Sequence, residues 1–307
     1  MNKKISIIIP ILNEEGNIVE FYNRTVKILD KINTEYEIIF CDNCSEDQSR
    51  SIIRDLSEKN RNVKGVFLSR NFGHQANLRS GLSIATGETA ITLDGDLQDP
   101  PELIEKIYAE YQDSFRSENK KLDIINTHRL QRKGEPFLRL FFIKSYYFLC
   151  KIFISDNIHY NTGDYRLYSK RVYEIINSEK SKNIFLRSYV NELGFNSKSI
   201  GYIREPRGKN ESKMNILNLF KFGLDGIISS SNRLLRFISV VSFILIVVSF
   251  IYIFFSSNKI MNNEFLFFAI SSFFLIAVSI LSEYMANLYN EIRRKPAFII
   301  DEIIKKK

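Results

Sequence analysis

The sequence predicts an α/β protein: a mostly parallel sheet flanked by helices, then interfacial helices and two C-terminal transmembrane helices. Two observations predict this class. Short apolar runs alternate with stretches of helical periodicity from Lys4 to about Arg129, which is typical of a parallel sheet covered on both faces. Further along, Phe237–Ser257 and Phe265–Ser282 contain no charged residue, and each approaches the roughly 20 residues that cross a bilayer.

The alternating region predicts five buried strands with four helices between them. The expected strands are Ile5–Ile9, Glu37–Cys41, Val63–Leu68, Thr89–Leu93 and Leu122–Asn126, and the expected helices are Glu15–Leu29, Asp47–Lys59, Gln75–Ala85 and Pro101–Tyr111. Ser45 and Gln48 form a plausible capping box for the second helix. In such sheets ligands bind beyond the carboxyl ends of the strands, so residues that follow strands are the first candidates for a site.

An acidic run, Leu93–Pro101, follows the fourth predicted strand. Asp94 and Asp96 point to the same side if the chain is extended, and carboxylates so close repel one another unless a cation lies between them. Two hard oxygen ligands suit Mg²⁺ or Mn²⁺ carrying a diphosphate. The alternative is a solvated acidic turn before the next helix.

The other strand ends also carry polar residues. Asn13-Glu14-Glu15 follows the first predicted strand, Asp42-Asn43 the second and Arg70-Asn71 the third. This coincidence is better evidence for a site than any one of the segments.

The apolar runs lie far from the N-terminus, so neither is a cleavable signal peptide. A buried soluble helix is the alternative to a membrane span. Arginines and lysines flank the pair of runs while the segment between them has few, so the positive-inside bias places both termini in the cytoplasm. We therefore expect a cytoplasmic α/β domain at 1–213, an interfacial amphipathic segment at 214–233, transmembrane helices at 234–257 and 265–288, and a basic cytoplasmic tail at 289–307.

The net charge of +8 suits a protein lying against anionic lipid. Nucleic acid is the competing partner, but no basic stripe with interleaved aromatic residues is present. The aromatic stretch Pro136–Phe153 is either core or a helix in the membrane interface. Cys41 and Cys44 have a Cys-x-x-Cys spacing, but no second pair completes a zinc set, and buried structural cysteines are favoured over a redox or zinc site.

Five segments of the chain stand out together as motifs: Ile9–Glu15, Cys41–Asp47, Ser69–Gln75, Leu93–Pro101 and Gly163–Leu167. As a set they resemble family 2 glycosyltransferases, in particular the branch that acts on polyprenyl phosphates, which includes bactoprenol glucosyltransferases and dolichol-phosphate mannosyltransferases, and the resemblance covers nearly the whole chain. It implies a GT-A (Rossmann-like) fold that binds a nucleotide-sugar at the strand ends.

The resemblance also implies roles for individual residues. It assigns Asp94, Asp96 and Gln98 to the metal, and it assigns nucleotide-sugar contacts to Pro10, Asn13, Glu15, Asp42, Arg70, Asp94, Arg207, Ser212 and Lys213. Asp42 would accept a hydrogen bond from uracil, and Arg207 to Lys213 would form a loop over the diphosphate, although Asn210 replaces the family's glycine there. His74 would line the donor pocket without a catalytic role.

Asp164 is the residue that the family places near the acceptor oxygen. A phosphate monoester is mostly dianionic at cytosolic pH, so Asp164 acts in positioning or electrostatics at least as much as in base catalysis. The candidates for holding the acceptor phosphate are the arginines Arg129, Arg132, Arg139 and Arg166, because guanidinium groups bind phosphate bidentately.

The resulting hypothesis is an inverting, metal-dependent transfer of one sugar, with glucose favoured, from a UDP-sugar to undecaprenyl phosphate on the cytoplasmic face of the inner (plasma) membrane. The product would serve cell-envelope glycan modification, and the enzyme could form homo-oligomers. Mannose, N-acetylhexosamine or a modified pentose is the alternative cargo. A processive polysaccharide synthase is disfavoured because the chain has no tryptophan for its Gln-x-x-Arg-Trp motif, and a non-catalytic adaptor because the acidic positions are retained.

Overall fold

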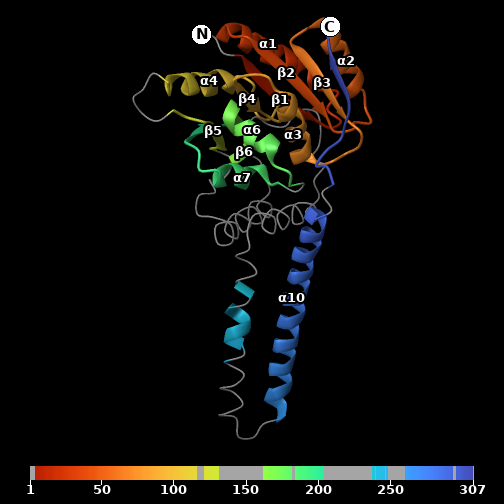
Figure 1. The fold of residues 1–307 in the computed structure, drawn as a ribbon, viewed down its shortest axis with the longest axis vertical. Helices are drawn as coiled ribbons and strands as arrows, with labels where there is room; N and C mark the ends of the chain where they lie inside the picture. Colours follow the sequence, from red (N-terminus) through yellow and green to blue (C-terminus); the bar gives the residue numbers. More distant parts are fainter. Residues whose placement is uncertain are drawn as a thin grey trace.

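An eight-stranded sheet with the order β7-β5-β6-β4-β1-β2-β3-β8 organises the protein (Figure 1). The computed structural model describes residues 4–115, 121–130, 162–181, 184–203, 237–238, 240–245, 247, 260–292 and 295–306. The sheet and its helices form the upper part of Figure 1, and helix α10 extends away from them.

The first half of the sheet is parallel and confirms the α/β class expected from the sequence. Its strands are β1 (Ile5–Ile11), β2 (Tyr36–Asp42), β3 (Val63–Leu68) and β4 (Thr89–Thr92). The helices between them are α1 (Ile18–Ile32), α2 (Ser49–Lys59) and α3 (His74–Ile84), and α4 (Leu103–Asp113) follows β4. Every residue of β1 is buried, which explains its nearly continuous apolar sequence: both faces of the strand are covered by helices.

Three described helices cover each face of the sheet. Apolar residues of α1, α2 and α4 pack in one core with Ile7 and Ile9 of β1, whereas those of α3, α6 (Lys170–Ser178) and α7 (Leu186–Glu192) pack in a second core with Ile8. Cys41 belongs to this second core, where burial raises the pKa of its thiol to about 12. Cys41 and Cys44 are both free, as expected of structural cysteines.

An antiparallel insertion continues the sheet beyond β4. Strand β6 (Thr162–Ser169) runs antiparallel between β4 and β5 (Ile124–Arg129), and β7 (Ser197–Tyr202) pairs with β5. Thr92, the last residue of β4, is opposite Arg166. Asp164, two residues earlier on β6, therefore lies beyond the end of β4, beside the acidic loop.

The C-terminal residues return to the sheet. After α10 (Ile260–Ile292), strand β8 (Ile300–Lys305) pairs antiparallel with the edge strand β3, and Arg54 of α2 forms a two-point ion pair with Glu302, with N–O distances of 3.0 and 2.5 Å. The segment expected as a basic tail, 289–307, thus supplies a strand of the sheet.

The expected membrane segments are described only in part. Residues 265–288 lie within α10, whereas 136–153, 214–233 and most of 234–257 lie outside the described residues. Within the described part of the chain, no helix combines the length and hydropathy that a membrane crossing requires.

Candidate active site

The loop after β4 holds the predicted metal ligands. The strand ends at Thr92, and the loop turns sharply at Leu97, where φ is 60°, so Asp94 and Asp96 do not share one face of an extended strand as the sequence analysis expected. Gly95 permits this turn to lie against β1, since a Cβ there would be 2.6 Å from a methyl carbon of Ile11. The residues remain at the carboxyl edge of the sheet, but a turn rather than strand alternation brings them there.

The Asp94 carboxylate is poised for a cation. Its Oδ1 atom is buried without a hydrogen bond, although His74 Nε2 lies 3.5 Å away, and burial raises the pKa of Asp94 to about 6, with His74 opposing this shift and Asp99 and Asp96 adding to it. The neighbouring Asp96 Oδ1 accepts the backbone N–H of Gln98 at 3.1 Å. A buried carboxylate oxygen with no donor costs free energy unless a ligand satisfies it.

The donor set fits Mg²⁺ or Mn²⁺, which prefer oxygen ligands from one or two carboxylates and complete their shell with water and substrate phosphates. No group of three His, Cys, Asp or Glu side chains among the described residues is arranged around one point, so these residues do not by themselves supply a complete metal cage. An open site of this kind is what a metal bound together with a diphosphate requires.

Asp164 is the most heavily bonded carboxylate of the site. Arg187 of α7 grips it at two points, Nε to Oδ1 at 3.0 Å and Nη2 to Oδ2 at 2.8 Å, and Gln75 Nε2 donates to Oδ2 at 3.3 Å. Burial by itself would raise the pKa of Asp164, but the charges and hydrogen bonds of Arg187 and His74 lower it well below its usual value. Asp164 is therefore ionised and held in place.

His74 connects Asp164 to the acidic loop. Its Nε2 atom lies 3.1 Å from Asp164 Oδ2 and 3.5 Å from Asp94 Oδ1. Burial would lower the pKa of His74, but the hydrogen bond to Asp164 and the Asp94 charge raise it. His74, expected from the sequence only to line the donor pocket, lies at the centre of the site.

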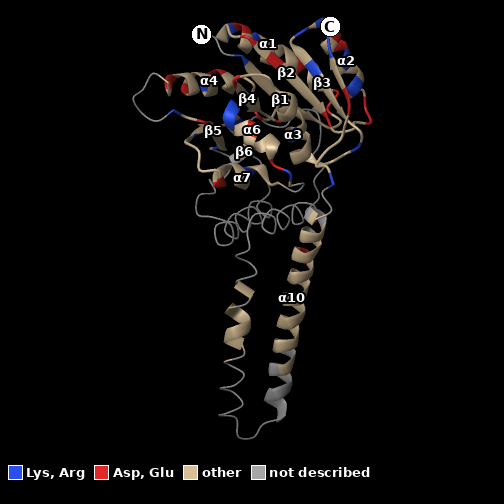
Figure 2. Ribbon diagram, viewed as in Figure 1, with Lys and Arg blue, Asp and Glu red and all other residues tan. Residues whose placement is uncertain are grey.

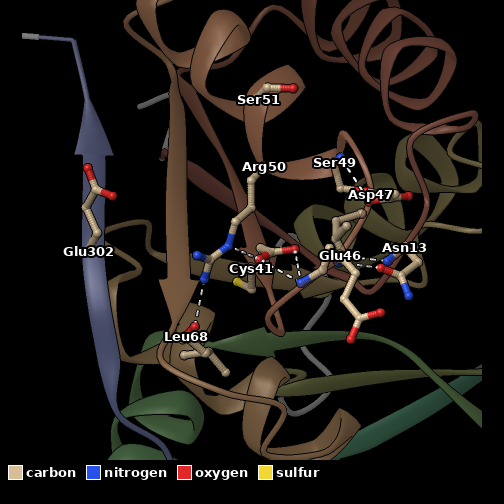
Figure 3. Close-up of polar contacts among 12 residues, drawn as sticks. Asn13, Cys41, Glu46, Asp47, Ser49, Arg50, Ser51, Leu68 and Glu302 are labelled. Atoms are coloured by element: carbon tan, nitrogen blue, oxygen red, sulfur yellow. Dashed lines mark hydrogen bonds and ion pairs between the residues drawn. The ribbon is translucent and has the colours of Figure 1, made fainter.

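The loops after β1 and β2 are bonded to each other (Figure 3). The Asn13 backbone N–H donates to Ser45 Oγ at 2.8 Å, and the Glu46 N–H donates to Asn13 Oδ1 at 2.8 Å. Glu15 similarly accepts the Gln48 N–H at 2.8 Å. The expected Ser45–Gln48 capping box is thus wrong. Helix α2 begins at Ser49, and the Ser45 hydroxyl instead accepts the backbone N–H of Asn13 in the loop after β1.

Asp42 lies at the floor of these loops and is fully buried. It accepts from Arg50 Nε at 2.7 Å and from the Ser45 N–H at 3.2 Å, while Arg50 Nη2 reaches the Leu68 carbonyl at 2.8 Å (Figure 3). Asp42 therefore organises the loop after β2 in addition to any contact with a nucleobase. Pro10 lies in β1 beside Cys41, at the same edge of the sheet.

Two predicted arginines differ in their surroundings. Arg129 lies beside the acidic loop and Gly163, with Nε donating to Tyr202 Oη at 3.2 Å, Nη2 lying 3.5 Å from Asp99, and its charge felt by Asp94. Arg70 is exposed and stacks on Phe72, with its guanidinium carbon 3.9 Å from the ring centroid. Five predicted residues lie outside the described residues: Arg132, Arg139, Arg207, Ser212 and Lys213.

Sequence reasoning missed three residues of this site. Arg187 lies in no motif, and its pairing with Asp164 exists only in the folded chain. Asp99, buried and bonded to Tyr202 Oη at 2.5 Å, was within the acidic run but received no role. Arg50 carried a signal, because it lies in the first turn of the helix expected at Asp47–Lys59, eight residues beyond Asp42.

Comparison with known proteins agrees with this geometry. The model of the family Glycosyl transferase family 2 matches residues 6–176. The chain is 30% identical to the glycosyltransferase YkcC of Bacillus subtilis over 97% of this chain and 93% of the relative. It is also 30% identical to the prophage bactoprenol glucosyl transferase homolog of Escherichia coli K12, over 98% of this chain and all of the relative.

A solved structure shares the fold. Mannosyl-3-phosphoglycerate synthase from Rubrobacter xylanophilus superposes with a TM-score of 0.55 at 12% identity, covering 76% of this chain and 74% of that one. At such low identity the likeness concerns the fold alone. With the family match over more than half of the chain and full-length relatives at 30% identity, the protein belongs to glycosyl transferase family 2 and is a glycosyltransferase.

Proposed function

We propose that this glycosyltransferase transfers a single sugar, with glucose favoured, from a UDP-sugar to undecaprenyl phosphate at the cytoplasmic face of the membrane, with inversion. The observation that carries the proposal is the meeting of the acidic loop and Asp164 at the carboxyl edge of the sheet, bridged by His74. In this proposal the donor diphosphate binds at the acidic loop and the acceptor binds next to it, beside Asp164. The name of the E. coli relative supports a lipid-linked acceptor and glucose.

The metal would be held by Asp94 and Asp96, with Gln98 beside them, and when bound it would neutralise the charge that develops on the leaving diphosphate. The loops joined through Asn13 and Ser45 would hold the nucleoside, with Asp42 fixed beneath them by Arg50. In the transfer, an acceptor phosphate oxygen forms a bond to the anomeric carbon while the bond to the diphosphate oxygen breaks.

Asp164 acts as a positioning residue in this proposal. Its carboxylate is neutralised by Arg187 and its pKa is low, which makes it a weak base. A phosphate monoester with a second pKa near 6 is largely dianionic at neutral pH, so little proton removal is needed. The carboxylate instead fixes the position of His74 and Gln75 against the donor site.

A membrane location is supported by the surface of α10. Many of its large apolar side chains are exposed, including Phe267, Phe274, Leu275 and Ile276, and Figure 2 shows charged residues gathered on the sheet while α10 is mainly without them. An exposed apolar patch of this extent marks a contact with lipid or protein. The two uncharged runs of the sequence favour lipid over protein as this contact. The positive charges that flank them favour a cytoplasmic location for the catalytic domain.

The test uses the full-length protein in detergent with Mn²⁺, undecaprenyl phosphate and radiolabelled UDP-glucose, read as lipid-extractable label. Asp94→Asn is expected to abolish transfer, and Asp55→Asn, which changes an exposed acidic residue of α2, serves as the matched control with wild-type activity. If a lipid-linked product forms from GDP-mannose or UDP-N-acetylhexosamine and none forms from UDP-glucose, the proposed donor sugar is wrong, but the proposed acceptor stands. The absence of product from every UDP- and GDP-sugar would refute the proposal.

A further inference from the structure

One buried arginine among the described residues has nitrogens without hydrogen-bond partners, although its side chain bonds to Tyr168. Arg166 of β6 is only 1% exposed, yet neither its Nε nor its Nη1 atom has a hydrogen-bond partner. Directly opposite on β5 lies Asn126, also 1% exposed, whose Oδ1 atom is equally without a partner. Two unsatisfied polar side chains therefore face the same interior space from neighbouring strands.

A buried guanidinium with unsatisfied donors is unfavourable, because the desolvation of its charge is only partly offset by hydrogen bonds. Arg79, a second buried arginine, shows the usual solution: its nitrogens donate to the carbonyl oxygens of Ser181 and Glu179 at 2.7 and 2.6 Å. Both terminal nitrogens of Arg79 are thus bonded, whereas Arg166 has open donors. Such a residue suggests a ligand.

The position of Arg166 indicates the kind of ligand. Arg166 and Asp164 are two residues apart on β6 and so point to the same face of the sheet. Asp164 already forms an ion pair with Arg187, and among the described residues Arg166 forms no ion pair with a carboxylate. A guanidinium presents paired N–H donors that match the oxygens of a phosphate group.

We infer that Arg166 and Asn126 form a seat for a phosphate group of the reaction, behind the Asp164–Arg187 pair. The inference rests on the proposed function for the identity of the phosphate, which belongs either to the lipid acceptor or to the nucleotide-sugar diphosphate. Asn126 contributes through its amide, which donates to a phosphate oxygen once its NH₂ group turns toward the seat.

The first experiment uses inorganic phosphate and thermal unfolding of the full chain in detergent, with chloride at equal ionic strength as the reference. Phosphate raises the Tm of the wild type, because a ligand that binds only the folded state stabilises it. Arg166→Met removes an uncompensated buried charge, so its Tm in chloride is equal to or above that of the wild type, and phosphate no longer raises it. Arg79→Met, the matched control, lowers the Tm in chloride and keeps the phosphate response.

Two further variants keep the inference testable if Arg166→Met does not fold. Asn126→Asp places a carboxylate opposite the guanidinium, so the resulting ion pair fills the seat and the phosphate response disappears. Arg166→Lys retains the charge but lacks the paired donors, and its phosphate response is weaker than that of the wild type. An unchanged phosphate response in these variants, or none in the wild type, overturns the inference.

Turnover assays then identify the phosphate. A rise of about tenfold or more in the KM for undecaprenyl phosphate in Arg166→Lys, with UDP binding unchanged, assigns the seat to the acceptor, since a lost charge-assisted contact is worth roughly this factor. Weaker binding of UDP with Mn²⁺ assigns it to the donor. Failure of the wild type to transfer any sugar would refute the proposed function, but the phosphate response would still report on the seat.

Discussion

The ion pair between Asp164 and Arg187 allows a sharp test, because its partners differ in burial. The Asp164 side chain is 4% exposed and that of Arg187 is 27% exposed. In Arg187→Met the carboxylate remains buried without its main counter-charge, which costs about 3–5 kcal/mol in the free energy of unfolding. In Asp164→Asn the guanidinium of Arg187 is partly exposed to water and can still donate to the amide oxygen of the new asparagine. The cost in the free energy of unfolding is therefore only about 1–2 kcal/mol.

The assay is thermal unfolding of the full chain at pH 7. For a domain of roughly 200 residues, each kcal/mol shifts the Tm by about 2–4 °C, so Arg187→Met is expected to lower it by about 6 °C or more. Asp164→Asn lowers it by less, and the double variant is more stable than Arg187→Met alone because no charge is left buried. A larger loss in Asp164→Asn than in Arg187→Met would refute the reasoning.

The same pair predicts a pH dependence. The pKa of Asp164 is lowered in the folded state, so its contribution is fully present above the unfolded value of about 3.9 and is lost as the pH falls toward the folded pKa. In Arg187→Met the main counter-charge is gone and burial raises the pKa of Asp164, so the variant regains stability relative to the wild type as the pH falls through that raised pKa. The stability difference between the two proteins therefore narrows on acidification from neutral pH, and a difference that stayed constant from about pH 7 to pH 3 would contradict this assignment.

Three further predictions concern the metal, the C-terminal strand and the packing. Burial raises the pKa of Asp94 to about 6, so protons compete with Mn²⁺ for this carboxylate below that pH. Mn²⁺-dependent binding of UDP, measured by calorimetry, is therefore expected to weaken between pH 7 and pH 5. Equal affinities at the two pH values would count against Asp94 as a metal ligand. Deleting 300–307 uncovers the edge of β3 and removes the partly buried side chains of Ile300 and Ile304. This loss is expected to lower the free energy of unfolding by about 2–3 kcal/mol. An unchanged Tm would show that β8 adds no stability. Gly81→Ala places a Cβ 2.4 Å from Ile8 and 2.5 Å from Cys41, and this overpacking costs about 1–3 kcal/mol, whereas Gly16→Ala, which meets no atom within 4 Å, is the tolerated control.

The strands that are buried on both faces could be predicted from the sequence, because short, continuous apolar runs are typical of strands covered by helices on both sides. Strands β1 to β5 appear within a few residues of their expected places. Strands β6 to β8 were not predicted, since β6 carries polar residues such as Asp164 and Arg166, and β8 is half exposed at the edge of the sheet. A strand that carries site residues or covers an edge lacks the apolar pattern by which strands are recognised.

By itself the sequence determined the family, the α/β class and the acidic loop at a strand end, because these depend on local apolar periodicity and on motifs of adjacent residues. Only the tertiary structure decided the partners of those residues. Arg187 meets Asp164 across 23 positions, His74 lies between two carboxylates, and Arg166 is buried with two nitrogens that lack hydrogen-bond partners. Such pairings depend on strand order and register, which are set by packing of the whole sheet and leave no trace in the spacing of residues along the chain.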